Sequence, residues 1–190
     1  MSFELMSELY DGLRQVAADN AAWVVVLTGE GRGFCSGLDL EDPGMIPGIN
    51  DMSLARIGML AMGHFSRIVP ALRDLPQPVI AAINGACAGA GLSLACACDL
   101  RVASSEASFV PGFIGIGLVP DAGSTWFIHR LLGFSRAFEW MVSNRRLSAA
   151  EALAWGLVSE DITADRFANR VAELAEWYAE RPTRAVAMTK

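Results

Sequence analysis

Two glycine-rich segments, each placed after an apolar run, could supply backbone N–H groups for chemistry. The first, Cys35-Ser36-Gly37-Leu38, comes after the apolar run at 23–27. The second, Gly89-Ala90-Gly91, comes after the run at 79–84 and leads into small apolar residues that predict a helix. The start of a helix carries unpaired N–H groups and a partial positive charge. Two such amides could stabilise an oxygen atom on which negative charge develops, but these glycines could equally serve only close packing and turns.

The pattern of apolar residues predicts the elements that must position these segments. Continuous β-branched runs predict strands buried on both faces, and we expect strands at 23–27, 79–84, 100–103 and 157–159. We expect helices over residues 3–18, 54–75, 122–132, 135–144, 149–155 and 165–179. Ser148 and Glu151 form a capping box at the start of one of these helices. Strands that alternate with helices indicate an α/β layer architecture.

Composition excludes several classes of partner. The chain has 190 residues, of which 53% are hydrophobic, which is enough for one domain with a large core. It carries 21 acidic against 15 basic residues, a net charge of −6, and nucleic-acid binding normally needs a basic surface. Lys190 is the only lysine, so the sequence has no polybasic patch for a membrane surface. We therefore expect neither a nucleic acid nor a membrane as a partner.

The cysteines and histidines do not predict a metal site. The four cysteines include no CxxC pair, and the chain has only two histidines. Cys96 and Cys98 lie in an apolar run, where cysteine most often serves as a small core residue. This usage of cysteine is typical of a reducing compartment, so we expect a cytoplasmic protein without a bound metal.

Several motifs together resemble one known family. Residues 24–40 resemble the first signature of the crotonase (enoyl-CoA hydratase/isomerase) superfamily, and residues 78–95 resemble the second. Residues 99–103, 117–123 and 147–158 resemble later blocks of the same family. The likeness extends over essentially the whole chain, with spacing close to that of the family.

The resemblance implies a fold and an organisation of the chain. It implies a crotonase (ClpP/crotonase-like) spiral of repeated ββα units with a helical C-terminal region. Residues 1–145 would form the crotonase core and residues 146–190 the start of the C-terminal helical region. Family members are longer, so the resemblance implies that leading strands and trailing helices are missing here. It also implies a homotrimer or a dimer of trimers.

The resemblance also implies a substrate and a binding site. The substrate would be an acyl-CoA thioester whose carbonyl oxygen accepts hydrogen bonds from the amides of Leu38 and Ala90, giving a stabilised enolate. Coenzyme A would be part of the substrate, so no separate cofactor is expected. Arg32 is a candidate for a phosphate of coenzyme A, or it is an ordinary solvated loop residue. The adenine would lie against Ser36, Asp39 and Leu40.

The residues that move protons distinguish members of this family. Hydratases of the family that this chain resembles have two glutamates in common. When the motifs are aligned, this chain has Ser93 and Phe113 at those two positions. Neither side chain can act as a general acid or base, so an ordinary hydratase mechanism is not expected. Asp121 resembles the aspartate of the ring-1,2-epoxyphenylacetyl-CoA isomerase and related enoyl-CoA isomerase branch. A single carboxylate suffices to move a proton between two carbons, which favours double-bond isomerisation.

Asp121 also has a purely structural interpretation, because aspartate before a helix is a favoured N-cap. In the catalytic interpretation, Phe113 and Trp126 would be apolar walls that raise the pKa of Asp121. The acyl chain would then lie among Phe113, Leu118 and Trp126, although these residues could equally belong to the core.

Other functions remain open from the sequence. Hydratase-like chemistry and a non-catalytic acyl-CoA-binding role are two of them. A third is the chemistry of the 4-chlorobenzoyl-CoA dehalogenase branch, which needs a histidine where this chain has Pro70. Gly91-Leu-Ser-Leu-Ala95 superficially resembles a serine nucleophile motif, which would require His64 or His129 beside Ser93. A dinucleotide-binding loop is not indicated, because residues 31–37 do not match GxGxxG.

Overall fold

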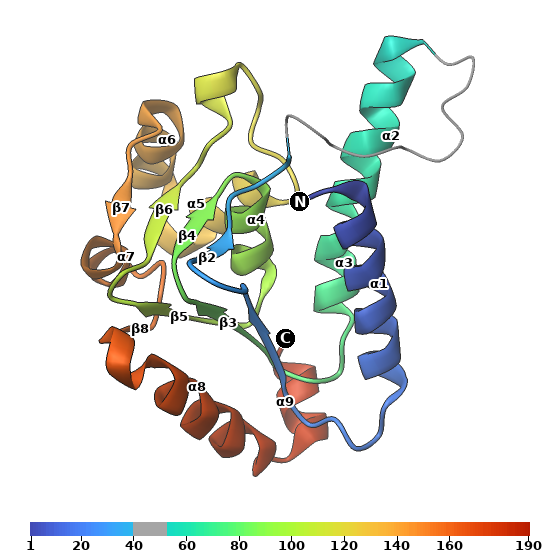
Figure 1. Cartoon of the computed structure of the whole chain (residues 1–190), viewed down its shortest axis with the longest axis vertical. Helices are drawn as coiled ribbons and strands as arrows, with labels where there is room; N and C mark the ends of the chain where they lie inside the picture. Colours follow the sequence, from blue (N-terminus) through green and yellow to red (C-terminus); the bar gives the residue numbers. More distant parts are fainter. Residues whose placement is uncertain (40–52) are drawn as a thin grey trace.

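Two four-stranded sheets form the centre of the molecule in the computed structural model, which describes residues 1–39 and 53–190 (Figure 1). In the first sheet the neighbouring strands follow the order β1, β3, β5 and β8, and all pairs are parallel. These strands are β1 (Val25–Thr28), β3 (Val79–Ile83), β5 (Leu100–Ser104) and β8 (Glu160–Ile162). Every residue of β3 is buried, as expected for the second strand of a sheet covered on both faces.

The second sheet follows the order β2, β4, β6 and β7. Its strands are β2 (Gly33–Cys35), β4 (Ala86–Ala88), β6 (Ser108–Val110) and β7 (Leu147–Ser148). The first three strands are parallel to one another, and β7 pairs antiparallel with β6. The sheet therefore repeats the order of the first one, with one later strand added at its edge.

The helices complete a repeating ββα pattern around these sheets. Three times the chain runs through a strand of the first sheet, then a strand of the second sheet, and then into helices. The helices are α1 (Phe3–Ala18), α2 (Leu54–Ser66), α3 (Ile68–Arg73), α4 (Ala90–Ala97), α5 (Ser124–Leu132), α6 (Phe134–Ser143), α7 (Ala149–Trp155), α8 (Ala164–Ala179) and α9 (Thr183–Thr189), with a 3-10 turn η1 at Ile114–Ile116. This arrangement confirms the expected α/β spiral with a helical C-terminal part.

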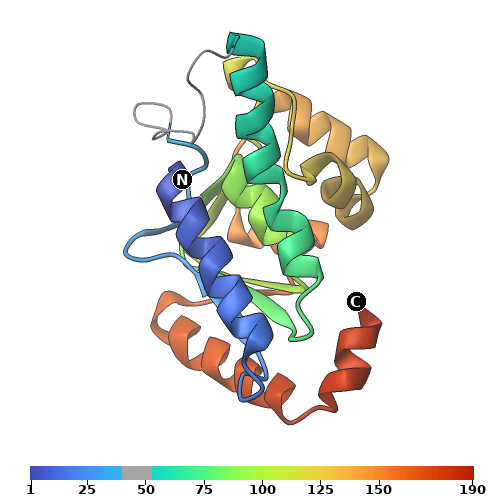
Figure 2. The same cartoon turned by 90° about the vertical axis from the view of Figure 1, so that its right-hand side faces the viewer.

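Helices cover the sheets from several sides. Figure 2 shows α1 alongside α2 and α3 on one side of the molecule, where α1 contacts α3. Helix α4 lies in the centre, and its residues 91–97 are all buried. Helix α8 packs on the first sheet, where Phe167 and Val171 contact a small cluster built around Ile80. The core thus encloses the first turn of α4 and the strands that lead into it.

The predicted helix over residues 54–75 is wrong in one respect, because the structure breaks it at Arg67. Pro70 lies in the first turn of α3 and has no N–H to donate to the preceding turn. A proline is tolerated at that position only because the first N–H groups of a helix have no intrahelical partner.

One strand prediction also needed correction, and the short strands of the second sheet, β2, β4, β6 and β7, were not predicted. The strand expected at 157–159 lies at Glu160–Ile162, because Leu157 instead donates from its amide to the carbonyl of Ala152 at 2.9 Å and closes α7. The short strand Ala86–Ala88 was not predicted, because its small residues resemble a turn rather than a strand. The predicted capping box is confirmed, with Ser148 and Glu151 bonding reciprocally.

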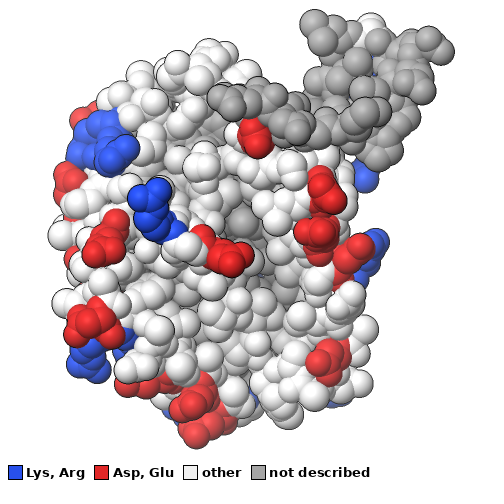
Figure 3. All heavy atoms as spheres, in the orientation of Figure 1, with Lys and Arg blue, Asp and Glu red and all other residues white. Residues whose placement is uncertain are grey.

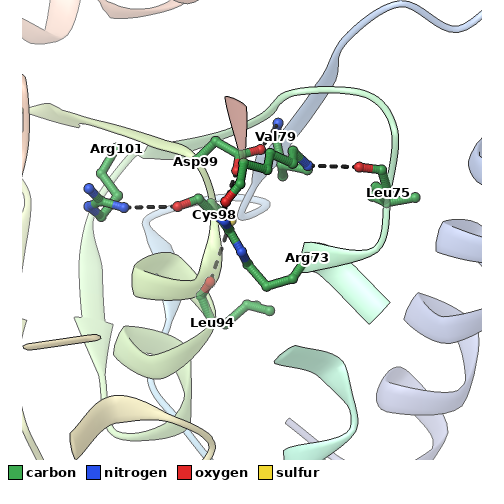
Figure 4. Close-up of polar contacts among 8 residues, drawn as sticks. Arg73, Leu75, Val79, Leu94, Cys98, Asp99 and Arg101 are labelled. Carbon is green, nitrogen blue, oxygen red and sulfur yellow. Dashed lines mark hydrogen bonds and ion pairs between the residues drawn. The ribbon is translucent and has the colours of Figure 1, made fainter. Parts of the chain in front are cut away.

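Asp99 joins three parts of the fold through its carboxylate (Figure 4). It accepts hydrogen bonds from the Val79 amide at 2.8 Å and from Arg73 at 2.7 Å. The Nζ of Lys190, the only lysine, lies 2.8 Å from the same carboxylate and also donates to the Leu75 carbonyl at 3.0 Å. These bonds tie α3 and the end of α9 to the start of β3.

The surface carries mixed charges. Acidic and basic side chains are interspersed on the face shown in Figure 3, without a large basic patch among the described residues there. Within residues 1–39 and 53–190, no helix is long and apolar enough to cross a membrane. The same residues contain no group of three or more His, Cys, Asp or Glu that could hold a metal ion.

Candidate active site

The two glycine-rich turns identified in the sequence pack directly against each other. Gly37 has a φ of +98°, and a Cβ placed on it would lie 3.6 Å from the Ala90 nitrogen. A Cβ on Gly91 would lie 2.3 Å from the Cys35 carbonyl oxygen, which is a severe clash. Glycine is therefore needed for the close approach of the turn before Leu38 to the turn that carries Ala90.

Both amides are available to a ligand. Ala90 is the first residue of α4, so its N–H precedes the i to i−4 hydrogen bonds of the helix. The N–H of Leu38 donates to no residue in the described part of the chain. Two amides from adjacent turns are the arrangement needed to stabilise an oxyanion.

A third loop, which contains Gly112, packs against the turn at Gly89. Gly112 has a φ of +81°, and a Cβ on it would lie 3.0 Å from the Gly89 nitrogen. The Gly112 amide donates to the side-chain oxygen of Asn144 at 2.7 Å. Sequence reasoning missed both residues. The residue type of Asn144 was a usable signal, because asparagine and glycine are favoured at a helix end in the left-handed conformation, and Asn144 ends α6 in that way.

Asp121 is anchored by its backbone and not by its carboxylate. Its carbonyl oxygen accepts hydrogen bonds from the Ser124 amide at 2.9 Å, the Ser124 hydroxyl at 2.7 Å and the Ser93 hydroxyl at 3.1 Å. The N-cap of α5 is Gly123, and no side chain caps that helix. The structure therefore does not support the interpretation of Asp121 as an N-cap.

The carboxylate of Asp121 lies in a partly buried environment. Its Oδ1 atom is buried and has no hydrogen-bond partner among the described residues. Burial raises the pKa of Asp121, and a hydrogen bond with its own backbone lowers that pKa by a smaller amount. The raised pKa of Asp121 agrees in direction with the sequence-based hypothesis.

Ser93 and Phe113, at the two positions where hydratases have glutamates, are both buried. Ser93 is 0% exposed, and Phe113 is 6% exposed at the start of the η1 turn. His64 packs against Phe3 and Tyr10.

The second histidine, His129, stacks on Phe134, 4.9 Å between ring centroids. The hydroxyl of Ser93 donates to carbonyl oxygens. The residues of a serine triad are consequently not assembled around Ser93.

The three residues predicted to line an acyl pocket differ in exposure. Phe113 is buried, whereas Leu118 is 44% and Trp126 is 58% exposed. The guanidinium carbon of Arg130 lies 3.1 Å from the centroid of the Trp126 ring, so one face of that ring is covered. The pocket therefore stays a prediction for these side chains.

The predicted coenzyme A-binding residues lie in and after the Gly29–Gly33 loop. Arg32, Ser36 and Asp39 are exposed, and Leu40 lies outside the described residues. Asn84, which sequence reasoning missed, holds this loop.

The Asn84 side chain accepts from the Gly29 amide at 3.2 Å and donates to the Gly31 carbonyl at 3.1 Å. A polar residue directly after a buried strand was the available signal. The loop that carries Arg32 is thus fixed to the end of β3.

Comparison with known proteins now decides the family. The family model described as "Enoyl-CoA hydratase/isomerase" matches residues 1–190, the entire chain. The chain belongs to the enoyl-CoA hydratase/isomerase family. This finding confirms the resemblance to the crotonase superfamily.

Relatives within this family have different names. A 4-chlorobenzoyl coenzyme A dehalogenase of an Arthrobacter species is 36% identical over 189 residues, which cover 100% of this chain and 67% of the relative. A 1,2-epoxyphenylacetyl-CoA isomerase of Escherichia coli is 36% identical, over 98% of this chain and 70% of the relative. A protein of Mycobacterium bovis named "Probable enoyl-CoA hydratase echA12" is 39% identical, over 100% of this chain and 67% of the relative. The chain thus spans about two thirds of the length of these relatives.

A solved structure confirms the crotonase fold for this family member. A "probable enoyl-CoA hydratase/isomerase" from Mycobacterium abscessus superposes with a TM-score of 0.91 at 36% identity. The likeness covers 100% of this chain and 70% of that structure.

Proposed function

We propose that this member of the enoyl-CoA hydratase/isomerase family moves a double bond in an enoyl-CoA thioester. The amides of Leu38 and Ala90 bind the thioester carbonyl oxygen and stabilise the enolate that forms when a proton leaves the substrate. Asp121 takes that proton from one carbon and returns it to another, so that no water is added. Coenzyme A belongs to the substrate, and no further cofactor takes part.

One observation carries this proposal. Asp121 has a buried and unpartnered carboxylate oxygen, while its backbone is bonded to the helix that begins with Ala90. A carboxylate placed in this way can exchange a proton with a substrate held by the Ala90 amide. No second acid or base stands at the positions of the hydratase glutamates, because Ser93 and Phe113 occupy them.

Substrate binding rests on the residues around the first turn. We assign the adenine of coenzyme A to Ser36, Asp39 and Leu40, and a phosphate to Arg32. The acyl chain lies against Phe113, Leu118 and Trp126. In this proposal the protein acts in the cytoplasm as a homotrimer or a dimer of trimers, as expected for the family.

Dehalogenation is the second candidate, because a 4-chlorobenzoyl-CoA dehalogenase is 36% identical to this chain. In that reaction the carboxylate of Asp121 would attack the aromatic carbon that bears chlorine, chloride would leave, and water would hydrolyse the resulting ester to regenerate Asp121. The histidine that this branch requires is replaced by Pro70, and His64 packs against aromatic residues near α1. These two observations favour isomerisation.

A pair of assays tests the proposal. We expect conversion of 3-enoyl-CoA to 2-enoyl-CoA, measured over several acyl lengths, to be faster than hydration of 2-enoyl-CoA. Asp121→Asn should lower kcat for isomerisation by about 10²–10⁴, the usual contribution of a general acid or base. Asp11→Asn, an exposed change on α1, is the control and should leave the rate unchanged.

Three results would contradict the proposal. Fast hydration without isomerisation would indicate a hydratase. Chloride release from 4-chlorobenzoyl-CoA without isomerisation would indicate a dehalogenase. Turnover that Asp121→Asn leaves unchanged would remove Asp121 from the mechanism.

A further inference from the structure

Ser93 stands out among the buried polar side chains. Four side chains in the described residues are classed as buried and polar: Gln77, Ser93, Ser104 and Ser124. Two of them, Ser93 and Ser124, donate hydrogen bonds to the same atom, the carbonyl oxygen of Asp121. Buried hydroxyls need a partner. The Ser93 hydroxyl lies 3.4 Å from the Gly89 carbonyl oxygen and 3.1 Å from that of Asp121, so its shorter contact is the one to Asp121.

The three donors over-determine the backbone at Asp121. A carbonyl oxygen has two lone pairs, and this one accepts from the two hydroxyls and from the Ser124 amide. Ala122, the next residue, has a φ of +45°, a left-handed conformation that alanine rarely adopts. Strained conformations persist where surrounding bonds hold them, and they concentrate at functional sites.

The two serines hold Asp121 to different parts of the fold. Ser124 is three residues further along the chain, so its bonds close a local turn at the start of α5. Ser93 is on α4, three residues after Ala90 and therefore nearly one helical turn from it. The bond from Ser93 is consequently the one that connects the Asp121 loop to the helix that supplies the Ala90 amide.

We infer that Ser93 is a positioning residue, which holds the Asp121 carboxylate at a fixed place relative to the Ala90 amide. Ser93 does this through the Asp121 carbonyl, without touching the substrate. The inference rests on the proposed function, in which Asp121 carries the proton. In this inference Ser93, at a position where hydratases have a glutamate, does not transfer protons itself but positions Asp121.

The consequence of losing this bond is predictable. Without the Ser93 hydroxyl, Asp121 keeps both bonds from Ser124, so its carbonyl stays satisfied and the local turn persists. The loop then loses its polar link to α4, and small displacements of a catalytic group greatly reduce rates. The amides of Leu38 and Ala90 are unchanged, so substrate binding should be retained.

Matched alanine variants test the inference. Ser93→Ala and Ser124→Ala each remove one hydroxyl from the same carbonyl, and their kcat, KM and melting temperature would be measured with a 3-enoyl-CoA substrate. We expect Ser93→Ala to lower kcat by about tenfold to hundredfold with KM within about twofold. We expect Ser124→Ala to lower kcat by less than about threefold, since the Ser124 amide still donates to Asp121.

Ser93→Cys guards against a variant that fails to fold. The thiol is larger than the hydroxyl but keeps a weak donor at the same position, so kcat should lie between those of wild type and Ser93→Ala. Equal effects of Ser93→Ala and Ser124→Ala on kcat would overturn the inference, as would a kcat for Ser93→Ala or Ser93→Cys that matches wild type.

Asp121→Asn separates failure of the inference from failure of the proposed function. If Asp121→Asn abolishes isomerisation while the Ser93 variants leave kcat unchanged, the positioning role is wrong and the function stands. If Asp121→Asn leaves isomerisation unchanged, the proposed function itself is wrong, and the positioning role is lost with it.

Discussion

At the scale of single residues, the backbone and the side chain of Asp121 have different roles. The backbone of Asp121 is fixed by three donors, and its carboxylate is left without a partner at Oδ1 among the described residues. An aspartate used for stability would show the opposite pattern, with its carboxylate capping a helix or pairing with a cation. Asp99 shows that second pattern, since Arg73, Lys190 and the Val79 amide all contact its carboxylate.

The raised pKa of Asp121 predicts a pH dependence of the rate. Burial disfavours the charged carboxylate, so its pKa lies above the ordinary value of 3.8. In the proposed mechanism, Asp121 of the free enzyme must be in the carboxylate form to remove a proton from the substrate. We therefore expect kcat/KM for isomerisation to fall as the pH drops through this raised pKa, and to be constant above it.

A pH–rate profile checks this prediction. The midpoint of the acid limb in kcat/KM reports the essential group of the free enzyme. A midpoint at or below 3.8 would contradict the effect of burial. Substrates that differ in acyl length should give the same midpoint, because kcat/KM reports the enzyme before the substrate binds.

At the scale of elements, the proposed oxyanion site depends on the close packing of two glycine turns. The first turn of α4 approaches β2 so closely that a Cβ on Gly91 would lie 2.6 Å from the Cys35 Cβ as well as 2.3 Å from its carbonyl oxygen. Both contacts involve atoms that cannot rotate away. The distance between the two amides therefore depends on the absence of a side chain at Gly91.

Gly91→Ala tests this dependence. We expect the clash with Cys35 to push α4 away from β2, to destabilise the fold by about 1–3 kcal/mol, and to raise KM or lower kcat by separating the amides. Gly12→Ala on α1 is the matched control, because a Cβ there meets no atom within 4 Å. That change should stabilise the protein by up to about 1 kcal/mol, since alanine is the better helix former.

Thermal or urea unfolding and steady-state kinetics measure both variants. A Gly91→Ala protein with wild-type stability and activity would show that the approach of the two turns can relax without consequence. A destabilised Gly12→Ala protein would show that position 12 does not tolerate a side chain and is unsuitable as a control.

At the scale of the whole molecule, one partly buried charge cluster joins α3, the first sheet and the end of α9. The side chain of Asp99 is 21% exposed and that of Lys190 is 9% exposed. Through them α3, the start of β3 and the end of α9 meet at one place (Figure 4). The single lysine of the chain lies in this contact.

Asp99→Asn should destabilise the folded protein. It removes the negative charge that Arg73 and Lys190 share, so two cations are left close together and their hydrogen bonds weaken. We expect a loss of about 1–3 kcal/mol in the free energy of unfolding, measured by urea denaturation.

The control is Asp11→Asn, whose partner Arg14 is exposed on α1, and which should change stability by less than about 1 kcal/mol. Equal effects of the two changes would contradict the structural importance of the Asp99 cluster.

The sequence by itself determined the family, the α/β class and the positions of the glycine turns. Periodicity and glycine spacing are local properties, so α1, α7 and the turns at Gly37 and Gly89 could be predicted without a structure. The prediction was wrong locally, at β4 and at the break between α2 and α3. The strand β4 depends on pairing with β2 and β6, which a local pattern does not show. The break before α3 follows from Pro70, a local signal that the prediction of one continuous helix did not use.

Only the tertiary structure decided what the chemistry-bearing residues contact. Ser93 and Asp121 are 28 residues apart in the chain, and their hydrogen bond forms because α4 packs against the start of α5. The bond between Gly112 and Asn144 joins residues 32 apart in the same way. A sequence pattern specifies side-chain chemistry and local conformation. Contacts over such separations depend on the packing of the whole core. That packing shows that Asp121 does not cap α5 and leaves its carboxylate as a candidate acid.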